Sequence, residues 1–252
     1  MEVHHHPNSE RKKFKHYLFE FFMLFLAVFC GFLAEYQLEH IIEKQRAKDY
    51  TKSIHRDLSA DTTIFNNTIE RLTICTKKID TLVDLLGNAE ESQKRTAFAY
   101  HLSVYAFIYP DASPNETTLL QLINSGSLRY IKNSKLVDSL KHYFNNIQLL
   151  KDFYNAANDI NRDFRKNQLQ FIDINPLLEY MQLGGIFSRS ILNLTDTAFF
   201  NNRQLLTNTP LQLKNYANWC VLKKFYLINT IYRFKELKLN ATNLLKLLDT
   251  NK

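Results

Sequence analysis

"KHYLFEFFMLFLAVFCGFLAEYQLEH", residues 15–40, is the stretch that decides the architecture of this chain. Residues 21–34 carry no charge, a length that by itself would also suit a signal peptide or a buried helix. Extended to residues 17–36, the run gives about 20 mostly apolar positions, or roughly 30 Å of helix, which matches a bilayer core. Phenylalanine dominates the run, and few water-soluble helices are so apolar on every face. We therefore expect a transmembrane helix over residues 16–36.

The ends of this run have the residues expected at a membrane boundary. Tyr17 and Tyr36 bracket it, as aromatic residues do at membrane–water interfaces. Glu20 lies one turn inside the first boundary, where an acid costs less than at the bilayer centre, and Glu35 adjoins the second boundary. We expect all four residues at the membrane interface. Alternatively, Glu20 makes a polar contact with a partner helix or between copies of this helix.

The flanks of the run predict an uncleaved anchor with a defined orientation. No A-x-A-like cleavage site follows the apolar core, and Cys30 follows Phe29, which is not the small residue that a lipoprotein signal requires. "RKKFK", residues 11–15, precedes the run, and the next lysine or arginine after it is Lys44. By the positive-inside rule, residues 1–15 form a short cytoplasmic head and residues 37–252 an extracytoplasmic domain.

The N-terminal block, "MEVHHHP" followed by "RKKFKHYLFEFFMLFLAVFCGFLAEYQLEH", resembles a group of uncharacterised single-pass membrane proteins of Gram-negative bacteria. Members share a His-containing head, basic residues, a Phe-rich span and an "AE…EH" exit, here Ala34-Glu35 and Glu39-His40. Residues 122–144 also look like a stretch found in such domains of unknown function. The resemblance implies a membrane-anchored helical protein and carries over no activity. With the orientation above, it predicts the inner membrane and a periplasmic C-terminal domain.

Beyond the span, the sequence predicts an all-α, elongated antiparallel bundle. Glycine and proline number five each, and neither interrupts residues 32–86. Apolar residues recur there at helical spacing from Ile54 to Leu86, so the span should continue as one helix. Further helices are expected over about 90–109, after a capping box at Ser113–Glu116, over 133–171 with apolar steps of four and three, and from Thr209 to about Leu248. Residues 173–208 read as short helices and loops.

No motif specifies a reaction. The chain lacks a Walker A loop, G-x-G-x-x-G, G-x-S-x-G, H-x-x-x-H and C-x-x-C, so we expect no enzyme, no cofactor and no metal. The run His4–His6 could bind Zn²⁺ loosely but lacks the geometry of a closed site, and the remaining histidines are dispersed. Glu116 and Asp111 could act as paired carboxylates, although capping explains Glu116 better. The aromatic residues of 100–109 favour core packing over a ligand pocket.

The net charge of +7 lies entirely in residues 203–252. Such a segment suits an acidic partner, anionic lipid or nucleic acid, but a solvated helix face with counter-charges on a neighbouring helix is the favoured interpretation. We expect no nucleic-acid partner.

Cys75 and Cys220 fall on apolar phases of the first and last long helices. If the last helix starts at the far end and runs back toward the membrane, the two thiols lie at one height and could form a disulfide. The same direction carries basic residues toward anionic headgroups, namely Arg233, Lys235, Lys238 and Lys246.

Two function classes remain after these exclusions. The favoured one is a structural or protein-interaction component of the cell envelope, whose partners are the bilayer and either another protein or a second copy. The alternative is a sensory or ligand-binding periplasmic domain that signals through a partner, because a head of about a dozen residues offers no output of its own.

Overall fold

The computed structural model describes residues 10–88, 90–91, 95–110, 112–176, 179, 203–207 and 209–250. Within these residues the named elements are α1 (Glu10–Gly87), α3 (Thr96–Ala106), α4 (Thr117–Asn124), the 3₁₀ helix η1 (Ser127–Tyr130), α5 (Ser134–Gln168) and α8 (Pro210–Asp249). The one β feature among them is an isolated bridge between Ile172 and Leu205. The all-α prediction is confirmed.

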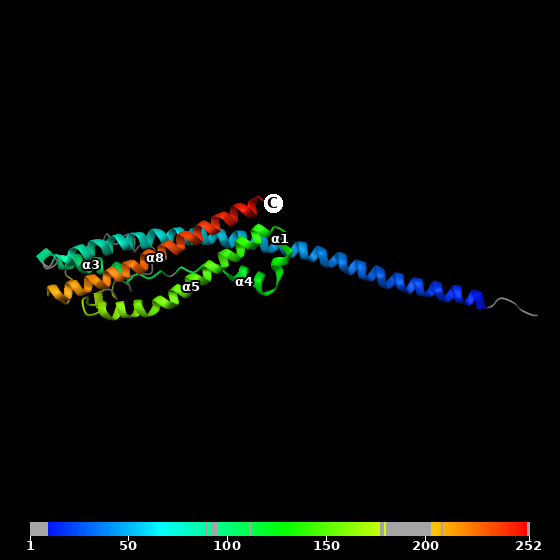
Figure 1. Ribbon diagram of the computed structural model, residues 1–252. Coiled ribbons are helices and arrows are strands. Elements are labelled where there is room, and N and C mark those ends of the chain that lie inside the picture. The colour runs from blue at the N-terminus through cyan, green and yellow to red at the C-terminus, as the bar shows by residue number, and fades with distance from the viewer. Residues whose placement is uncertain are drawn as a thin grey trace, which may run out of the picture.

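Helix α1 is continuous over 78 residues, and its first part projects alone from the bundle (Figure 1). Side chains from residue 14 through 42 are all exposed, and the first buried one is Ile54. No proline lies inside the helix to break it. The expected continuation of the apolar run into one long helix is therefore confirmed.

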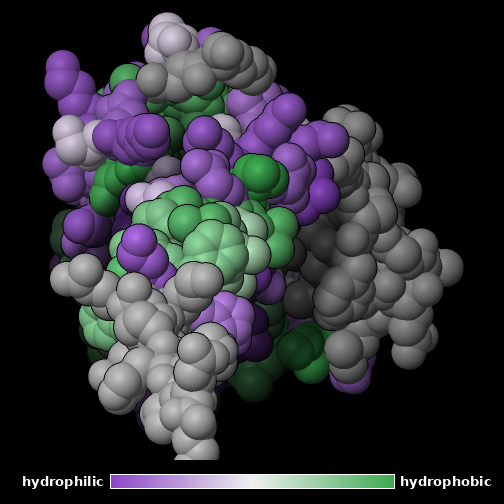
Figure 2. Space-filling model, turned by 90° about the vertical axis from the view of Figure 1, so that its right-hand side faces the viewer, coloured by the Kyte–Doolittle hydropathy of each residue, from purple (hydrophilic) through white to green (hydrophobic). Residues whose placement is uncertain are grey.

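The remaining elements pack beside the second part of α1 as an elongated, alternating bundle (Figure 1). We call the end from which α1 projects the proximal end and the opposite end the distal end. Helix α3, residues 107–110 and residues 112–116 return from the distal end, α5 runs outward again, and α8 runs back. In an end-on view, hydrophobic side chains gather on the projecting helix, and hydrophilic ones dominate the described surface around it (Figure 2).

Three contacts fix the register of α1 against α8. Lys224 pairs with Asp80, Lys238 Nζ donates to Asn66 Oδ1 at 2.6 Å, and the His55 ring lies 3.3 Å from Asp249. From the first contact to the second, and from the second to the third, the steps are 14 and 11 residues on both helices. The two helices therefore run straight and antiparallel over this length, as expected for α8.

The bundle holds two contiguous cores, because α8 meets different partners along its length. The distal core gathers Leu72, Tyr100 and Tyr216, and the proximal core gathers Phe65, Tyr143 and Phe234. Each fully buried side chain of this size stabilises the fold by about 1.5–3 kcal/mol. The predicted seam of α5 lies in these cores, with Leu136, Leu140, Tyr143, Ile147, Leu150, Ala157, Asn161 and Phe164 buried.

The predicted helix starts were partly wrong. Helix α4 begins at Thr117, and Glu116 at its N-cap makes no capping hydrogen bond. The Glu116 carboxylate pairs instead with Lys151 and accepts from Gln148 Nε2 at 3.3 Å. The capping box fails because residues 112–116 are held outside the helix by Asp61, described below. The helix expected over residues 90–109 is described as α3, Thr96–Ala106.

Candidate functional site

The four residues predicted at a membrane interface are exposed on the projecting part of α1. This part holds one apolar stretch long enough to cross a membrane. Glu20 Oε1 lies 3.3 Å from His16 Nε2 one turn earlier, and the Tyr36 ring packs edge-on against His40, with centroids 4.4 Å apart. Tyr17 and Glu35 share the same exposed helix. The structure thus leaves this helix free for an apolar environment, and the membrane location of these residues stays a prediction.

Cys75 and Cys220 are both buried and free, so the expected disulfide is not formed. Because Asp80 pairs with Lys224, Cys75 is level with Asn229, nine residues beyond Cys220 and about 14 Å along the axis. The two cysteines lie at different positions along the bundle axis, and not at the same position as expected, for a physical reason. Gly87, the end of α1, is level with Ala217, so α8 begins seven residues farther out than α1 ends.

Three basic side chains of α8 have partners within the bundle, one of them an acid. Lys224 pairs with Asp80, Lys238 binds Asn66, and the Arg233 guanidinium lies 4.6 Å from the Phe153 ring centroid. By the same register, Lys246 is level with Leu58 of α1, which is 22 residues beyond Tyr36. If Tyr36 marks the membrane boundary, Lys246 therefore lies about 33 Å from it along the helix axis. At that distance, screening over about 8 Å at physiological ionic strength would leave little attraction between Lys246 and the headgroups.

Lys223 is a buried amine that our reading of the sequence missed. It is 1 % exposed, its Nζ donates to Asn161 Oδ1 at 3.1 Å, and it lies 4.0 Å from the Tyr109 ring centroid. The rings of Phe164 and Tyr226 lie 5.6 and 5.3 Å away. Burial, together with the nearby Arg165 charge, lowers the pKa of Lys223 to about 7. The helical spacing of the buried positions in α8 includes Lys223 and so could have indicated its burial. A lysine at such a position is ordinarily expected to be solvated, however.

Asp61 is a second buried charged residue, and it joins three segments. Its Oδ1 accepts from Asn115 N at 2.9 Å and Nδ2 at 2.7 Å, and its Oδ2 accepts from Tyr143 Oη at 2.6 Å. Burial raises the pKa of the Asp61 carboxyl. The neighbouring Asp57 accepts from the Thr118 hydroxyl. These contacts fasten residues 112–116 between α1 and α5, which is a structural role.

The remaining polar candidates do not assemble into a catalytic or metal site within the described residues. No group of three His, Cys, Asp or Glu side chains there could hold a metal ion. His55 and His40 each lie beside an acid, at 3.3 Å from Asp249 and 3.4 Å from Glu43. His101 is buried beside Tyr105, and His142 contacts Asn146 at 3.3 Å. The residues His4–His6 and Asp111 lie outside the described residues. Of the aromatic residues of 100–109, Tyr100 and Tyr105 are buried in the core, as predicted, and Phe107 and Tyr109 are half-buried.

An exposed apolar stripe runs along the outer side of α8. It consists of Val221, Phe225, Ile228 and Tyr232, spaced by four, three and four residues, and we call it the α8 face. Phe225 is 65 % exposed and Tyr232 61 %. Beside Phe225, an apolar groove of about 250 Å³ separates α8 from α5, lined by Phe153, Ala156, Ala157, Ile160, Leu222, Phe225, Tyr226 and Asn229. The described chain leaves this stripe uncovered.

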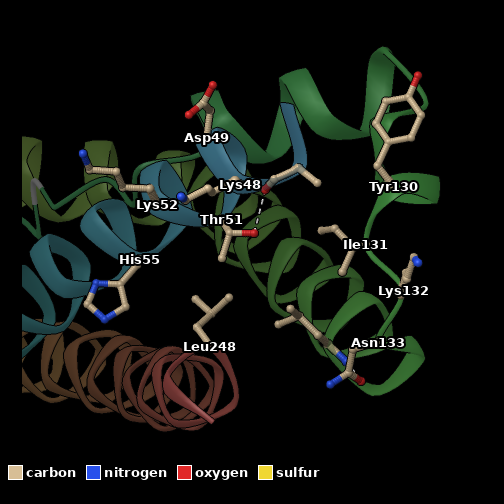
Figure 3. A pocket seen from close by; sticks show the side chains of 12 residues that line it. Lys48, Asp49, Thr51, Lys52, His55, Tyr130, Ile131, Lys132, Asn133 and Leu248 are labelled. Atoms are coloured by element: carbon tan, nitrogen blue, oxygen red, sulfur yellow. Dashed lines mark hydrogen bonds between the residues drawn. The ribbon is translucent and has the colours of Figure 1, made fainter. Parts of the chain in front are cut away.

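A larger hollow lies at the proximal end, where α1, the start of α5 and the end of α8 meet (Figure 3). We call it the proximal pocket; its volume is about 840 Å³. Thr51 of α1, Ile131 of the loop before α5, and Leu248 of α8 face this space (Figure 3). The sequence alone did not indicate it, because its lining comes from segments about 80 and 115 residues apart.

Comparison with protein-family models, with curated proteins and with solved structures found no match to this chain.

Proposed function

We propose that this chain is a membrane-anchored, non-enzymatic helical protein of the cell envelope that associates with a second copy through the α8 face. The exposed apolar stretch of α1 supports the anchor, since no described residue covers it and a bilayer would. The basic residues 11–15 support a cytoplasmic head by the positive-inside rule, and with it a periplasmic bundle.

The α8 face is the observation that carries the association. Alternating steps of four and three residues are the spacing of a coiled-coil seam, in which apolar side chains of two helices interlock. Contiguous exposed apolar side chains on an otherwise polar surface mark interaction sites. Two large aromatic residues, Phe225 and Tyr232, lie in this stripe, and aromatic residues dominate the binding energy of many interfaces.

A second copy is the occupant that fits this face best. Anchors at the same end hold all copies in one orientation, so two α8 helices meet in parallel about a two-fold axis along the membrane normal. The seam continues to Asn218, and an asparagine in such a seam fixes the register of parallel helices. It also continues through Lys235 to the exposed Leu239, so that the two Lys235 ammonium groups would meet across the two-fold axis with Glu236 of each copy beside them.

Anchoring also makes a modest interface sufficient. Confinement to the membrane raises the effective concentration of one copy near another, so association needs less interface than it would in solution. Pairing through α8 would bring two spans close together. The span face that holds Glu20, Ala27 and Gly31, opposite the stacked Phe21, Phe25 and Phe29 rings, could then approach its counterpart.

The mass of the full chain in detergent micelles tests this association. We expect wild type to be dimeric and Phe225→Glu to be monomeric, because a carboxylate in the seam would be buried without a partner. Lys77→Glu is the matched control, since Lys77 is exposed on α1 at nearly the same height and should stay dimeric. A monomeric wild type, or a Phe225→Glu variant that remains dimeric with unchanged helix content, would refute the proposal.

The second candidate, a ligand-binding domain, is favoured by one observation only, the proximal pocket. A ligand could bind in this pocket whether or not two copies pair through α8, because the pocket lies beyond the proximal end of the α8 face.

A further inference from the structure

We infer that the proximal pocket binds a soluble organic anion with an apolar body. A volume of about 840 Å³ lies within the range of small-molecule sites, roughly 300–1,000 Å³. Such sites combine a mostly apolar lining with a few charged or polar groups that orient the ligand. The proximal pocket has both parts, and they come from separate sets of residues.

The apolar part lies where three elements converge. Leu248 from α8 and Leu136 from α5 are buried beneath the hollow, and Ile131 and Ala47 are half-buried at its sides. Leu248 and Ile131 point toward the same open space (Figure 3). Covering these groups with a ligand's apolar body would remove them from water at about 25 cal/mol per Å². This part of the site selects for hydrocarbon or aromatic surface.

The charged part consists of Lys48, Lys52 and Lys132. All three are exposed, and none has an acidic partner among the described residues. Asp49 is the one acid in the described lining, and its Oδ1 accepts from Gln45 Nε2 at 3.0 Å. His55, also in the lining, lies 3.3 Å from Asp249. The lining therefore has a net positive charge from three flexible ammonium groups, which suits a carboxylate, sulfate or phosphate group.

The distance of the pocket from the membrane boundary indicates whether its ligand comes from the bilayer or from solution. The α1 residues in its lining, 47–55, lie 11–19 residues beyond Tyr36, or about 16–28 Å along the helix. Headgroups reach only about 5–8 Å beyond the hydrocarbon core. If Tyr36 marks the membrane boundary, a lipid would have to leave the bilayer to enter the pocket. A soluble amphiphile is therefore the ligand class that the position favours.

Titration calorimetry on the full chain in zwitterionic lipid nanodiscs tests this inference, with empty nanodiscs as the blank. The probe is octanoate, compared with acetate, which lacks the apolar body, and octanamide, which lacks the charge. We expect octanoate to bind at one site per chain and the other two probes at least tenfold more weakly. The triple variant Lys48→Ala, Lys52→Ala, Lys132→Ala should weaken octanoate binding at least tenfold.

A matched triple variant, Lys77→Ala, Lys141→Ala, Lys214→Ala, removes three exposed lysines elsewhere on the described surface and should leave octanoate binding unchanged. Fluorescence of Trp219, the single tryptophan, reports that each variant is folded. Equal loss in both triple variants, or no octanoate binding at millimolar concentration, would overturn the inference. Loss of octanoate binding when the nanodiscs contain phosphatidylglycerol would overturn the soluble source and assign the pocket to a lipid headgroup.

Discussion

The amine of Lys223 lies 3.1 Å from Oδ1 of Asn161, with both side chains closed off from water inside the distal half of the bundle. An ammonium ion in such a place loses its hydration, and one amide oxygen with three aromatic faces replaces only part of it. Lowering of the pKa of Lys223 to about 7 follows from this deficit. The amine therefore changes charge near neutral pH.

Stability should rise between pH 7 and pH 9 because of Lys223. The pKa of this group is about 7 in the folded chain and about 10.5 in the unfolded chain, so the unfolded state binds more protons across this window. The free energy of unfolding should increase by up to about 1.4 kcal/mol per pH unit. Urea unfolding of the full chain in micelles, followed by Trp219 fluorescence, measures this slope.

Lys223→Met supplies the matching test, since methionine has a similar length and no charge. It should raise stability at pH 7 and remove most of the slope, whereas Lys77→Met, at an exposed site, should change neither. A slope that persists in Lys223→Met would show that another group is responsible.

Asp61→Ala should destabilise the chain by about 2–4 kcal/mol, because it leaves the buried Tyr143 hydroxyl and two Asn115 donors without their acceptor. Asp61→Asn should cost less, since its amide oxygen can still accept from Asn115. Unfolding midpoints in urea give both values, with Asp163→Ala, an exposed site, as control. Equal effects of the two Asp61 variants would contradict the assigned hydrogen bonds.

The core thiols should be inert in the folded chain. Burial raises the pKa of Cys75 to about 12 and also raises the pKa of Cys220, so neither forms the reactive thiolate at neutral pH. In a Cys30→Ala background, maleimide at pH 7.5 should label neither thiol until urea unfolds the chain. Fast labelling under native conditions, or a mobility shift on reduction, would contradict the register of α1 and α8.

Orientation in the membrane has its own test. Alkaline phosphatase fused after Thr250 should be active and a fluorescent reporter that folds only in the cytoplasm should stay dark, because the basic residues 11–15 hold the N-terminus inside. The reverse pattern would place the bundle in the cytoplasm.

Local patterns in the sequence predicted the long elements well. The absence of proline and the helical spacing from Ile54 to Leu86 predicted the length of α1, and steps of four and three predicted the buried side of α5. The start of α8 was also predicted, with Thr209 at the N-cap and Pro210 at the first helical position, although the Thr209 hydroxyl donates to Gln212 Oε1 and makes no capping hydrogen bond to the backbone. Helix lengths, helix starts and buried helix faces depend on residues close together in the sequence, so the sequence can predict them.

Features that depend on distant segments were missed. The capping box at Ser113–Glu116 lost to hydrogen bonds between Asn115 and Asp61, 54 residues away. The heights of Cys75 and Cys220 depended on how far α8 extends past α1, which no local pattern sets. The role of Lys223 and the proximal pocket likewise arise only when three or more helices meet.

Cross-linking in native membranes tests the central claim most directly, because it reports anchoring and pairing together. In a Cys30→Ala background, we place a cysteine at Phe225→Cys in the α8 face or at Lys77→Cys on α1, which is nearly level with Phe225 on another exposed surface. Under mild oxidation, the account predicts a disulfide-linked dimer in the membrane fraction for Phe225→Cys and a monomer for Lys77→Cys. Equal cross-linking at both positions, or none at Phe225→Cys, would contradict it.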